Sequence, residues 1–371
     1  MATAPGLLTD WPWKPLGRFK YAVLSPWVVH STYNFLFGGE KRNTYYFFIF
    51  PLLVSRALHN LIWISYSRYR TAKGRRRIVD RGIEFEQVDR ESGWDDQIIF
   101  NGVLMYLLYW LAYPFLISFP AWNLRGVILT MVLHAGPVEF IYYWLHRALH
   151  HHFLYSRYHS HHHSSIVTEP ITSVTHPFAE HISYFLLFAI PIVTTVLTNT
   201  ASVASICGYI SYIDFMNNLG HCNFELVPTS LFAAFPPLKL LFYTPSYHSL
   251  HHTKFRTNYS LFMPFYDYLY NTVDKSSDNL HESSWRRPEE SPDVVNLEHL
   301  TSSLSICHLQ VGFASFASQP LSSKWYLRAA SIFTFPIGVL VTTFGKTFAS
   351  ERFTFKNLKY QTWVVPKFTK Q

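Results

Sequence analysis

The chain has 371 residues, of which 49% are hydrophobic, 18% aromatic and only 15% charged, and its formal net charge is +8. So apolar a composition argues against an ordinary water-soluble protein of this size and makes a lipid bilayer a candidate solvent. The positive charge does not indicate a nucleic-acid partner, because the bases are not interleaved with aromatics in a groove-like pattern, and three widely spaced cysteines (Cys207, Cys222, Cys307) favour neither disulfides nor a thiolate metal site.

Residues 1–44 are rich in aromatic side chains and predict an interfacial approach to the membrane. Trp11, Trp13 and Trp27 suit the lipid headgroup zone better than hydrocarbon. Asp10 and three prolines occupy the place where a signal peptide needs a basic start and an apolar core, so we expect no cleaved leader.

Apolar runs along the rest of the chain approach the roughly 20 residues that a membrane-crossing helix needs. They cover residues 45–66, 98–119, 127–145, 182–197 and 326–344, with a shorter run at 202–216. The basic loop after the first run, from Arg68 to Arg77, is expected to stay in the cytosol. Two helical hairpins then return the chain to that side, which places His146, His159 and His221 on one side of the membrane. The polar stretch 276–293 contains SSWRRPEESP and is typical of a linker.

The chain has 20 histidines, and most of them lie between His134 and His252. Such density in an apolar chain needs a reason, because an unpaired imidazole at membrane depth loses its hydration. Three clusters have metal-ligand spacing: HRALH at 146–150, HSHHH at 159–163 and HSLHH at 248–252. Helical residues spaced at i, i+3 and i+4 share a face, so each H-x-x-H-H motif predicts a three-ligand set.

The candidate ligands are His146, His150, His159, His162, His163, His248, His251 and His252. Eight are too many for one catalytic metal and suit two, so we predict a dinuclear centre. The alternatives are surface histidines with accidental spacing or a single regulatory metal. Imidazole suits iron, zinc and copper alike, while HExxH and Glu-x-x-His ligand patterns are absent from the clusters.

The other histidines carry weaker signals. His221 is the best additional ligand, because the apolar run before it should end near the same face. His176 and His181 could each be a ligand, a second-sphere donor or an interfacial residue, and the sequence favours none of these three roles over the others. His161 should point away from its neighbours, and at least one of the consecutive His150 to His152 should face solvent or a second sphere. The isolated residues are expected to be ordinary: His30, His59, His281, His299 and His308.

Several polar groups within the apolar runs should support the centre. His134 and Glu139 are expensive at membrane depth unless they are partnered, and Pro137 between them should kink the helix. Asp214, Asn217 and Asn218 raise the same expectation on another helix.

The order H-x3-H, H-x2-H-H, H-x2-H-H resembles the fatty acid hydroxylase and sterol desaturase superfamily. The runs GPVEFIYYWLHRALHHHFLYSRYHSHHHSSIVTEPITSVTHPFAEH, YIDFMNNLGHCNFE and TPSYHSLHHTKFRTNYSLFMPFYDY look like the plant eceriferum and glossy-like very-long-chain aldehyde decarbonylases. The resemblance implies an all-α, multi-span transmembrane helical bundle with a cytosolic histidine-rich di-metal cap. It divides the chain into an N-terminal membrane and interfacial region (1–125), a di-iron catalytic region (126–275), the linker (276–293) and a shortened start of a C-terminal wax-synthesis domain (294–371).

The resemblance also implies an activity. It predicts a non-haem di-iron enzyme that uses O2 to convert very-long-chain aldehydes to alkanes one carbon shorter plus formate, with the eight clustered histidines as catalytic ligands and His221 as a ninth metal ligand. Zinc is an alternative occupant. Electrons should come from NADPH through a reductase and cytochrome b5. The expected location is the endoplasmic reticulum membrane, multi-pass, with the active site facing the cytosol and a homodimer or a heterodimer with a paralogue as the assembly.

Two other functions remain open. The same centre could hydroxylate or desaturate a fatty acid or sterol, or the chain could be a non-catalytic partner in a wax-synthesis complex. Intact clusters favour catalysis, whereas the shortened C-terminus favours the partner.

Overall fold

The computed structural model describes residues 6–39, 45–116 and 119–290. Within these ranges the protein is helical, and its one β-type pairing is an isolated antiparallel bridge between Arg77 and Phe224. The predicted all-α class is therefore confirmed for the described part of the chain.

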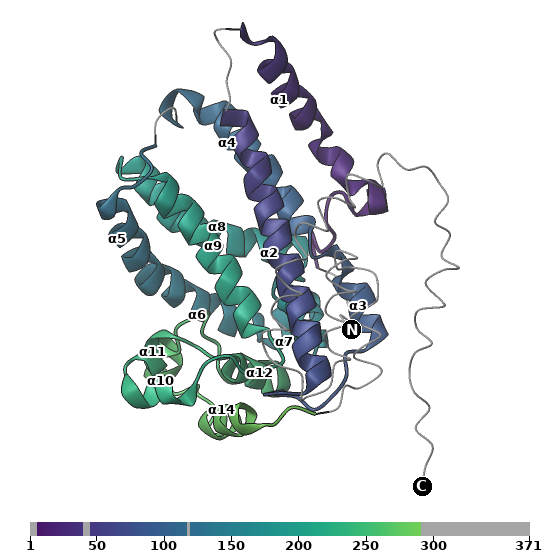
Figure 1. Ribbon diagram of the computed structural model, residues 1–371, viewed down its shortest axis with the longest axis vertical. Helices are drawn as coiled ribbons and strands as arrows, with labels where there is room; N and C mark the ends of the chain where they lie inside the picture. Colours follow the sequence, from purple (N-terminus) through teal and green to yellow (C-terminus); the bar gives the residue numbers. More distant parts are fainter. Residues whose placement is uncertain (1–5, 40–44, 117–118, 291–371) are drawn as a thin grey trace, which may run out of the picture.

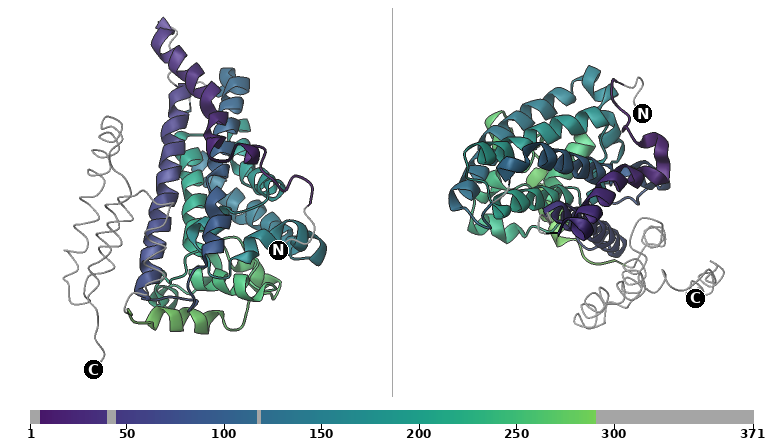
Figure 2. Two further views of the ribbon diagram at one scale, coloured as in Figure 1. Left: turned by 90° about the vertical axis from the view of Figure 1, so that its right-hand side faces the viewer. Right: turned by 90° about the horizontal axis from the view of Figure 1, so that it is seen from above.

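The long helices lie side by side and end near one another (Figures 1 and 2). α2 packs against α4 and α9, and α5 packs against α8 and α9. Their bounds are α2 (Tyr45–Lys73), α4 (Asp96–Leu116), α5 (Leu124–Leu133), α6 (Glu139–Leu149), α8 (Phe178–Leu197) and α9 (Val203–Gly220). Each contains or overlaps a predicted apolar run, while the run at 326–344 lies outside the described residues.

Local signals fix where several helices begin. Asn123 caps α5 by accepting from the backbone N–H groups of Arg125 and Gly126. Ser202 forms a capping box with Ser205 at the start of α9. These side chains satisfy N–H donors that the helix itself leaves unpaired.

A π-helical turn, η4 (His134–Val138), joins α5 to α6. It contains Pro137, which cannot donate a backbone hydrogen bond. The kink predicted at this proline thus takes the form of a widened turn within a helix that continues from Leu124 to Leu149.

Short elements gather at one end of the long helices (Figure 1). They connect the histidine clusters and cover them. Their bounds are α3 (Phe85–Arg90), η3 (Glu91–Gly93), α7 (His152–Arg157), η5 (His159–Ser164), η6 (Pro170–Val174), α10 (Thr229–Ala234), α11 (Leu238–Leu241), α12 (Pro245–Lys254), α13 (Phe265–Leu269) and α14 (Ser277–Arg286).

The linker expected at 276–293 is described as far as residue 290, and within it Ser277–Arg286 forms α14, which packs against α12. Its serines, charges and proline resemble a linker in composition. However, His281 is buried and donates from Nε2 to the carbonyl of Val227 at 2.8 Å, and the guanidinium of Arg76 stacks on Trp285. These contacts attach the segment to the helical domain.

Two of the N-terminal tryptophans, Trp11 and Trp13, precede η1 (Lys14–Leu24), and Trp27 lies within α1 (Ser25–Phe37). Trp13 is buried and donates to Asp96 Oδ1 at 2.8 Å, and Trp11 donates to the carbonyl of His176 at 3.1 Å. Both indoles therefore hold the N-terminal segment against α4 and the segment before α8.

Buried ion pairs connect helices that are distant in sequence. Arg56 on α2 makes a bidentate contact with Asp214 on α9, at 2.7 and 2.8 Å. Arg68, also on α2, pairs at 2.8 Å with Glu169, and both side chains are almost fully buried. A buried charge needs a partner to offset its lost hydration, so these pairs fix the position of α2.

Within the described ranges, two helices are long and apolar enough to cross a membrane, Leu124–Leu149 and Phe178–Leu197. Much of their apolar surface is not covered by protein. Exposed residues on them include Ile128, Met131, Leu186, Val193 and Leu197.

Candidate metal centre

The structure brings the nine predicted metal-ligating histidines into two adjacent groups. Within each group, one ring nitrogen of every histidine lies within 4.8 Å of the others. Group A contains His146, His150, His159, His163 and His251, and group B contains His162, His221, His248 and His252. The groups adjoin, because the rings of His163 and His252 have centroids 4.5 Å apart.

α6 supplies the first pair of histidines to group A. Four residues separate His146 from His150, so both lie on the buried side of this amphipathic helix. His146 is buried and His150, at the C-cap, is partly exposed. This pair is arranged as its spacing predicts.

Each H-x-x-H-H motif is divided between the two groups. His159 and His163 belong to group A while His162 belongs to group B. The α12 motif does the reverse, since His248 and His252 belong to group B and His251 to group A. The expected three-ligand set on one face therefore does not form. Consecutive residues point about 100° apart on the α-helix α12 and about 120° apart on the 3₁₀ helix η5, so adjacent histidines aim at different groups.

His221 lies at the C-cap of α9 and completes group B. Its Nε2 lies 3.0 Å from Nε2 of His248 and 3.4 Å from Nε2 of His162. The last turn of α9 positions it, because its Nδ1 contacts the carbonyl of Asn217 at 2.9 Å.

Main-chain carbonyls fix which ring nitrogen faces each group. Besides His221, three histidines contact a carbonyl through Nδ1: His146 with Tyr259, His162 with Thr172 and His251 with Thr257, at 2.7 to 2.9 Å. A carbonyl oxygen can only accept, so each Nδ1 carries the hydrogen. In the neutral ring, Nε2 then presents a lone pair to the group.

These lone pairs fit a bound cation. Nε2 of His146 lies 3.0 Å from Nε2 of His159, and both rings use Nδ1 to donate elsewhere. Two lone pairs at that distance repel each other unless a cation lies between them. Nitrogens bound to one metal at about 2.0–2.1 Å are roughly 3.0–3.4 Å apart. The buried rings of His163, His248 and His252 also have nitrogens without a hydrogen-bond partner.

Burial keeps these imidazoles neutral. Loss of hydration, reinforced by neighbouring histidines, lowers the pKa of His162, His163, His248 and His252 well below the usual value. Burial likewise lowers the pKa of His221 and His251 to about 3. Neutral imidazole is the metal-binding form, so the site is prepared for cations near neutral pH.

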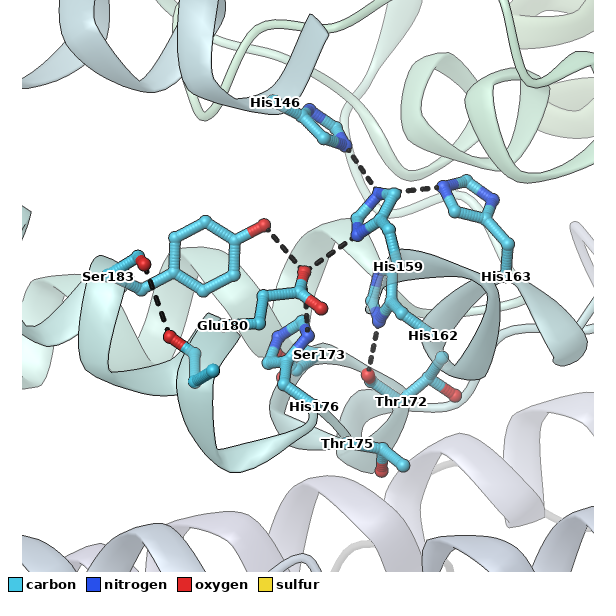
Figure 3. Close-up of polar contacts among 12 residues, drawn as sticks. His146, His159, His162, His163, Thr172, Ser173, Thr175, His176, Glu180 and Ser183 are labelled. Atoms are coloured by element: carbon cyan, nitrogen blue, oxygen red, sulfur yellow. Dashed lines mark hydrogen bonds and ion pairs between the residues drawn. The ribbon is translucent and has the colours of Figure 1, made fainter. Parts of the chain in front are cut away.

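Glu180 is a residue that the spacing argument did not identify. Its Oε1 accepts from Nδ1 of His159 at 2.7 Å and from the hydroxyl of Tyr184 at 2.9 Å (Figure 3). Nδ1 of His176 lies 3.4 Å from the same oxygen. The available signal was an acidic residue at the start of an apolar run, in HPFAEH, where a charge needs a partner.

The other polar residues lie outside both groups. Nε2 of His134 lies 3.4 Å from Glu139, which accepts from the backbone N–H of Phe262. Asp214 pairs with Arg56, and Asn218 donates to Asn60. His181 packs against Trp11, whereas His161, His151 and His152 are exposed. The expected contact between His134 and Glu139 is present, and of the predicted supporting residues on α9 it is Asn217 whose carbonyl contacts a clustered histidine, His221.

The arrangement can hold two cations, through nitrogen ligands, beside an apolar interior. The ring of Tyr142 packs against His146 and that of Tyr243 against His248. Both tyrosines belong to an apolar cluster of residues from α6, α8, α9 and the segments around α12. Such a centre suits chemistry on a lipid-like molecule.

Comparisons with known proteins agree with the geometry. Residues 131–272, which contain both histidine groups, match the fatty acid hydroxylase family. The whole chain is 61% identical to very-long-chain aldehyde decarbonylase CER1 of Arabidopsis thaliana and 58% identical to very-long-chain aldehyde decarbonylase GL1-5 of Oryza sativa subsp. indica. It spans 59% and 60% of those relatives. No solved structure matches the chain.

Proposed function

We propose that the chain is a non-haem di-iron aldehyde decarbonylase of the fatty acid hydroxylase family, whose model matches residues 131–272. Its substrates would be very-long-chain fatty aldehydes, converted with O2 to alkanes one carbon shorter plus formate in cuticular wax synthesis. The observation that carries this proposal is the pair of histidine groups, each of which receives histidines from both H-x-x-H-H motifs. The chain is also 61% identical to a relative named for that activity.

The reaction needs an external reductant. Conversion of one aldehyde and one O2 to alkane, formic acid and water consumes four electrons and four protons. We propose that NADPH supplies these electrons through a reductase and cytochrome b5. A bound pair of iron ions would activate O2 and polarise the aldehyde oxygen.

The protein's own residues hold and isolate the site. Main-chain carbonyls orient four rings, and Glu180 orients His159. Eight of the nine histidines are buried, which limits access of water. The apolar cluster that contains Tyr142 and Tyr243 packs beside His146 and His248 and shields that side of the site from water.

We also propose that the helices form a multi-span bundle in the endoplasmic reticulum membrane, with the histidines facing the cytosol. Two helices that meet the length and hydropathy of a span, and the exposed apolar residues along them, support this location. The proposed assembly is a homodimer, or a heterodimer with a paralogue.

Expression with cytochrome b5, its reductase and an even-chain aldehyde tests the activity. We expect an odd-chain alkane and an equal amount of formate, both abolished by His248→Ala or by removal of O2. His161→Ala is the matched control, because His161 lies in the HSHHH motif but is exposed and belongs to neither group. Alkane formation by His248→Ala, or without O2, would refute the proposal.

A second candidate is oxygen insertion or desaturation at a C–H bond of a fatty acid or sterol. The family that matches residues 131–272 is named for hydroxylation, whereas the similar relatives are named very-long-chain aldehyde decarbonylases, so this candidate ranks second. Mass spectrometry separates the two reactions, since hydroxylation leaves the carbon number unchanged. A non-catalytic partner would instead purify with substoichiometric iron.

A further inference from the structure

Glu180 is a buried carboxylate whose role the proposed reaction does not explain. Its side chain is fully buried, and that of His159 is 1% exposed. Figure 3 shows the carboxylate between His159, His176 and an aromatic ring that belongs to α8, on the opposite side of His159 from His146 and His163. Hence His159 contacts Glu180 through Nδ1, and His146 and His163 of group A through Nε2.

The countercharge for Glu180 does not come from a basic side chain. Among the described residues, its ion-pair contacts are His159 and His176 alone, and no lysine or arginine pairs with it. An ionised carboxylate is costly to bury unless positive charge lies nearby. A cation in group A would lie directly beyond the His159 ring and would supply that charge.

Glu180 also makes the two groups chemically different. In group B, His162 and His221 donate from Nδ1 to neutral carbonyls. In group A, His159 donates to a carboxylate, and its Nε2 lies 3.0 Å from that of His146 and 3.1 Å from that of His163. A carboxylate acceptor forms the stronger hydrogen bond and raises the basicity of the opposite ring nitrogen.

We propose that Glu180 is a positioning residue that makes group A the tighter of the two metal sites, by holding His159 in the Nδ1–H form and increasing the donor strength of its Nε2. The inference rests on the proposed function only in that both require two metal sites. It concerns the difference between these sites and not the reaction.

Glu180→Gln tests the proposal, because glutamine keeps an oxygen that accepts from His159 but removes the charge. We use Co²⁺ as the probe and titrate the loaded full-length protein with a chelator while following the visible absorption of Co²⁺. Two Co²⁺ should bind per chain in both proteins. In Glu180→Gln, the Co²⁺ in group A should be released at about 10- to 100-fold lower chelator concentration, with a shifted spectrum, while the Co²⁺ in group B is unchanged.

Glu139→Gln is the matched control. Glu139 is equally buried in the same bundle but contacts His134 and the backbone of Phe262, so both Co²⁺ should be released as in the unmodified protein. Should Glu180→Gln fail to fold, Tyr184→Phe removes one hydrogen bond to the carboxylate and should weaken the same Co²⁺ by a smaller factor.

The outcomes separate the two claims. The role of Glu180 is overturned if Glu180→Gln weakens the binding of both Co²⁺ ions equally, or if neither Glu180→Gln nor Tyr184→Phe weakens the binding of either ion. It is also overturned if Glu139→Gln weakens Co²⁺ binding as much as Glu180→Gln does. If the unmodified protein binds no pair of Co²⁺, the dinuclear centre itself is wrong and the proposed function fails with it.

Discussion

A single ring nitrogen decides whether each histidine here can bind a cation. Carbonyl contacts at Nδ1 leave Nε2 of His146, His162, His221 and His251 free to face the groups. In all of these except His221, the carbonyl belongs to a residue more than four positions away in the sequence. Spacing identifies which residues are candidates. It does not indicate the tautomer, because the acceptor on Nδ1 is in most cases supplied by another element.

The division of the H-x-x-H-H motifs makes a prediction about metal content. His162 and His248 belong to one group, whereas His163 and His248 belong to different groups. The double variant His162→Ala/His248→Ala should therefore retain about one metal per chain. His163→Ala/His248→Ala should retain almost none.

Elemental analysis of the purified variants measures this difference, and His161→Ala should retain the full content. The two double variants differ only in whether His162 or its neighbour His163 is replaced. If the loss of any histidine from the HSHHH motif had the same effect, both double variants would retain the same amount of metal. Equal metal loss in both doubles would contradict the division into group A and group B.

The neutral histidines also predict how acid affects the metal-free protein. Burial lowers the pKa of His221 and His251 to about 3, compared with about 6.5 in an unfolded chain. Between these values the unfolded state binds more protons, so the free energy of unfolding should fall as the pH drops from about 6.5 towards 3.

Thermal unfolding in detergent with a chelator present, followed at pH 7.5 and at pH 5, measures this effect. The expected result is a lower Tm at pH 5. A Tm that rises on acidification would show that these imidazoles are already charged in the folded state.

Helix ends and close helix contacts, more than helix interiors, position the candidate ligands. His150 lies at the end of α6, His221 at the end of α9, and η5 and α12 are short elements. Gly220, the last residue of α9, lies against Tyr243, whose hydroxyl donates to the carbonyl of Met216 at 2.6 Å. This contact places the segment before α12 beside His221.

Gly220→Ala should therefore destabilise the protein. The added Cβ would lie 1.9 Å from the hydroxyl oxygen of Tyr243, so the ring or the helix end must move. We expect a loss of about 1–3 kcal/mol in the free energy of unfolding, as for other overpacked interiors.

Gly208→Ala is the matched control in the same helix, because no atom lies within 4 Å of its added Cβ. It should be neutral or should stabilise by roughly 0.5–1 kcal/mol, since alanine favours a helix. Denaturant unfolding of both variants gives the comparison. Equal stability of the two would show that the Gly220 contact is not tight.

Across the whole molecule, the long helices bring their histidine-bearing ends to one side. α8 runs away from the histidines and α9 returns to them, so the turn between these helices lies at the far end (Figure 1). The basic loop after α2 lies on the histidine side, where Ile78 donates to the carbonyl of Asn223 and the backbone of Arg76 contacts Arg287.

This arrangement predicts membrane sidedness. In a background with all cysteines replaced, Arg75→Cys should react with an impermeant maleimide on sealed microsomes whose cytosolic face is outward. Thr198→Cys, in the turn between α8 and α9, should react only after detergent is added. Both positions are exposed, so accessibility within the protein is matched. Labelling of Thr198→Cys on sealed microsomes would contradict the proposed crossing of α8 and α9.

The sequence by itself determined the helical class, most of the helix positions and the identity of the clustered histidines. Apolar runs and ligand spacing are local properties, so they can be read without knowing how the helices pack. The family resemblance, which rests on the same motifs, is confirmed by the comparisons.

Only the tertiary structure decided how these parts meet. It divided each H-x-x-H-H motif between two groups, placed Glu180 against His159, bonded Trp11 and Trp13 to residues of other segments, and joined α14 to the domain. Each of these features depends on a partner from another element. The geometry of such a contact follows from long-range packing. The sequence indicates the direction of a side chain about its own helix, but only the packed structure shows which residues lie in that direction.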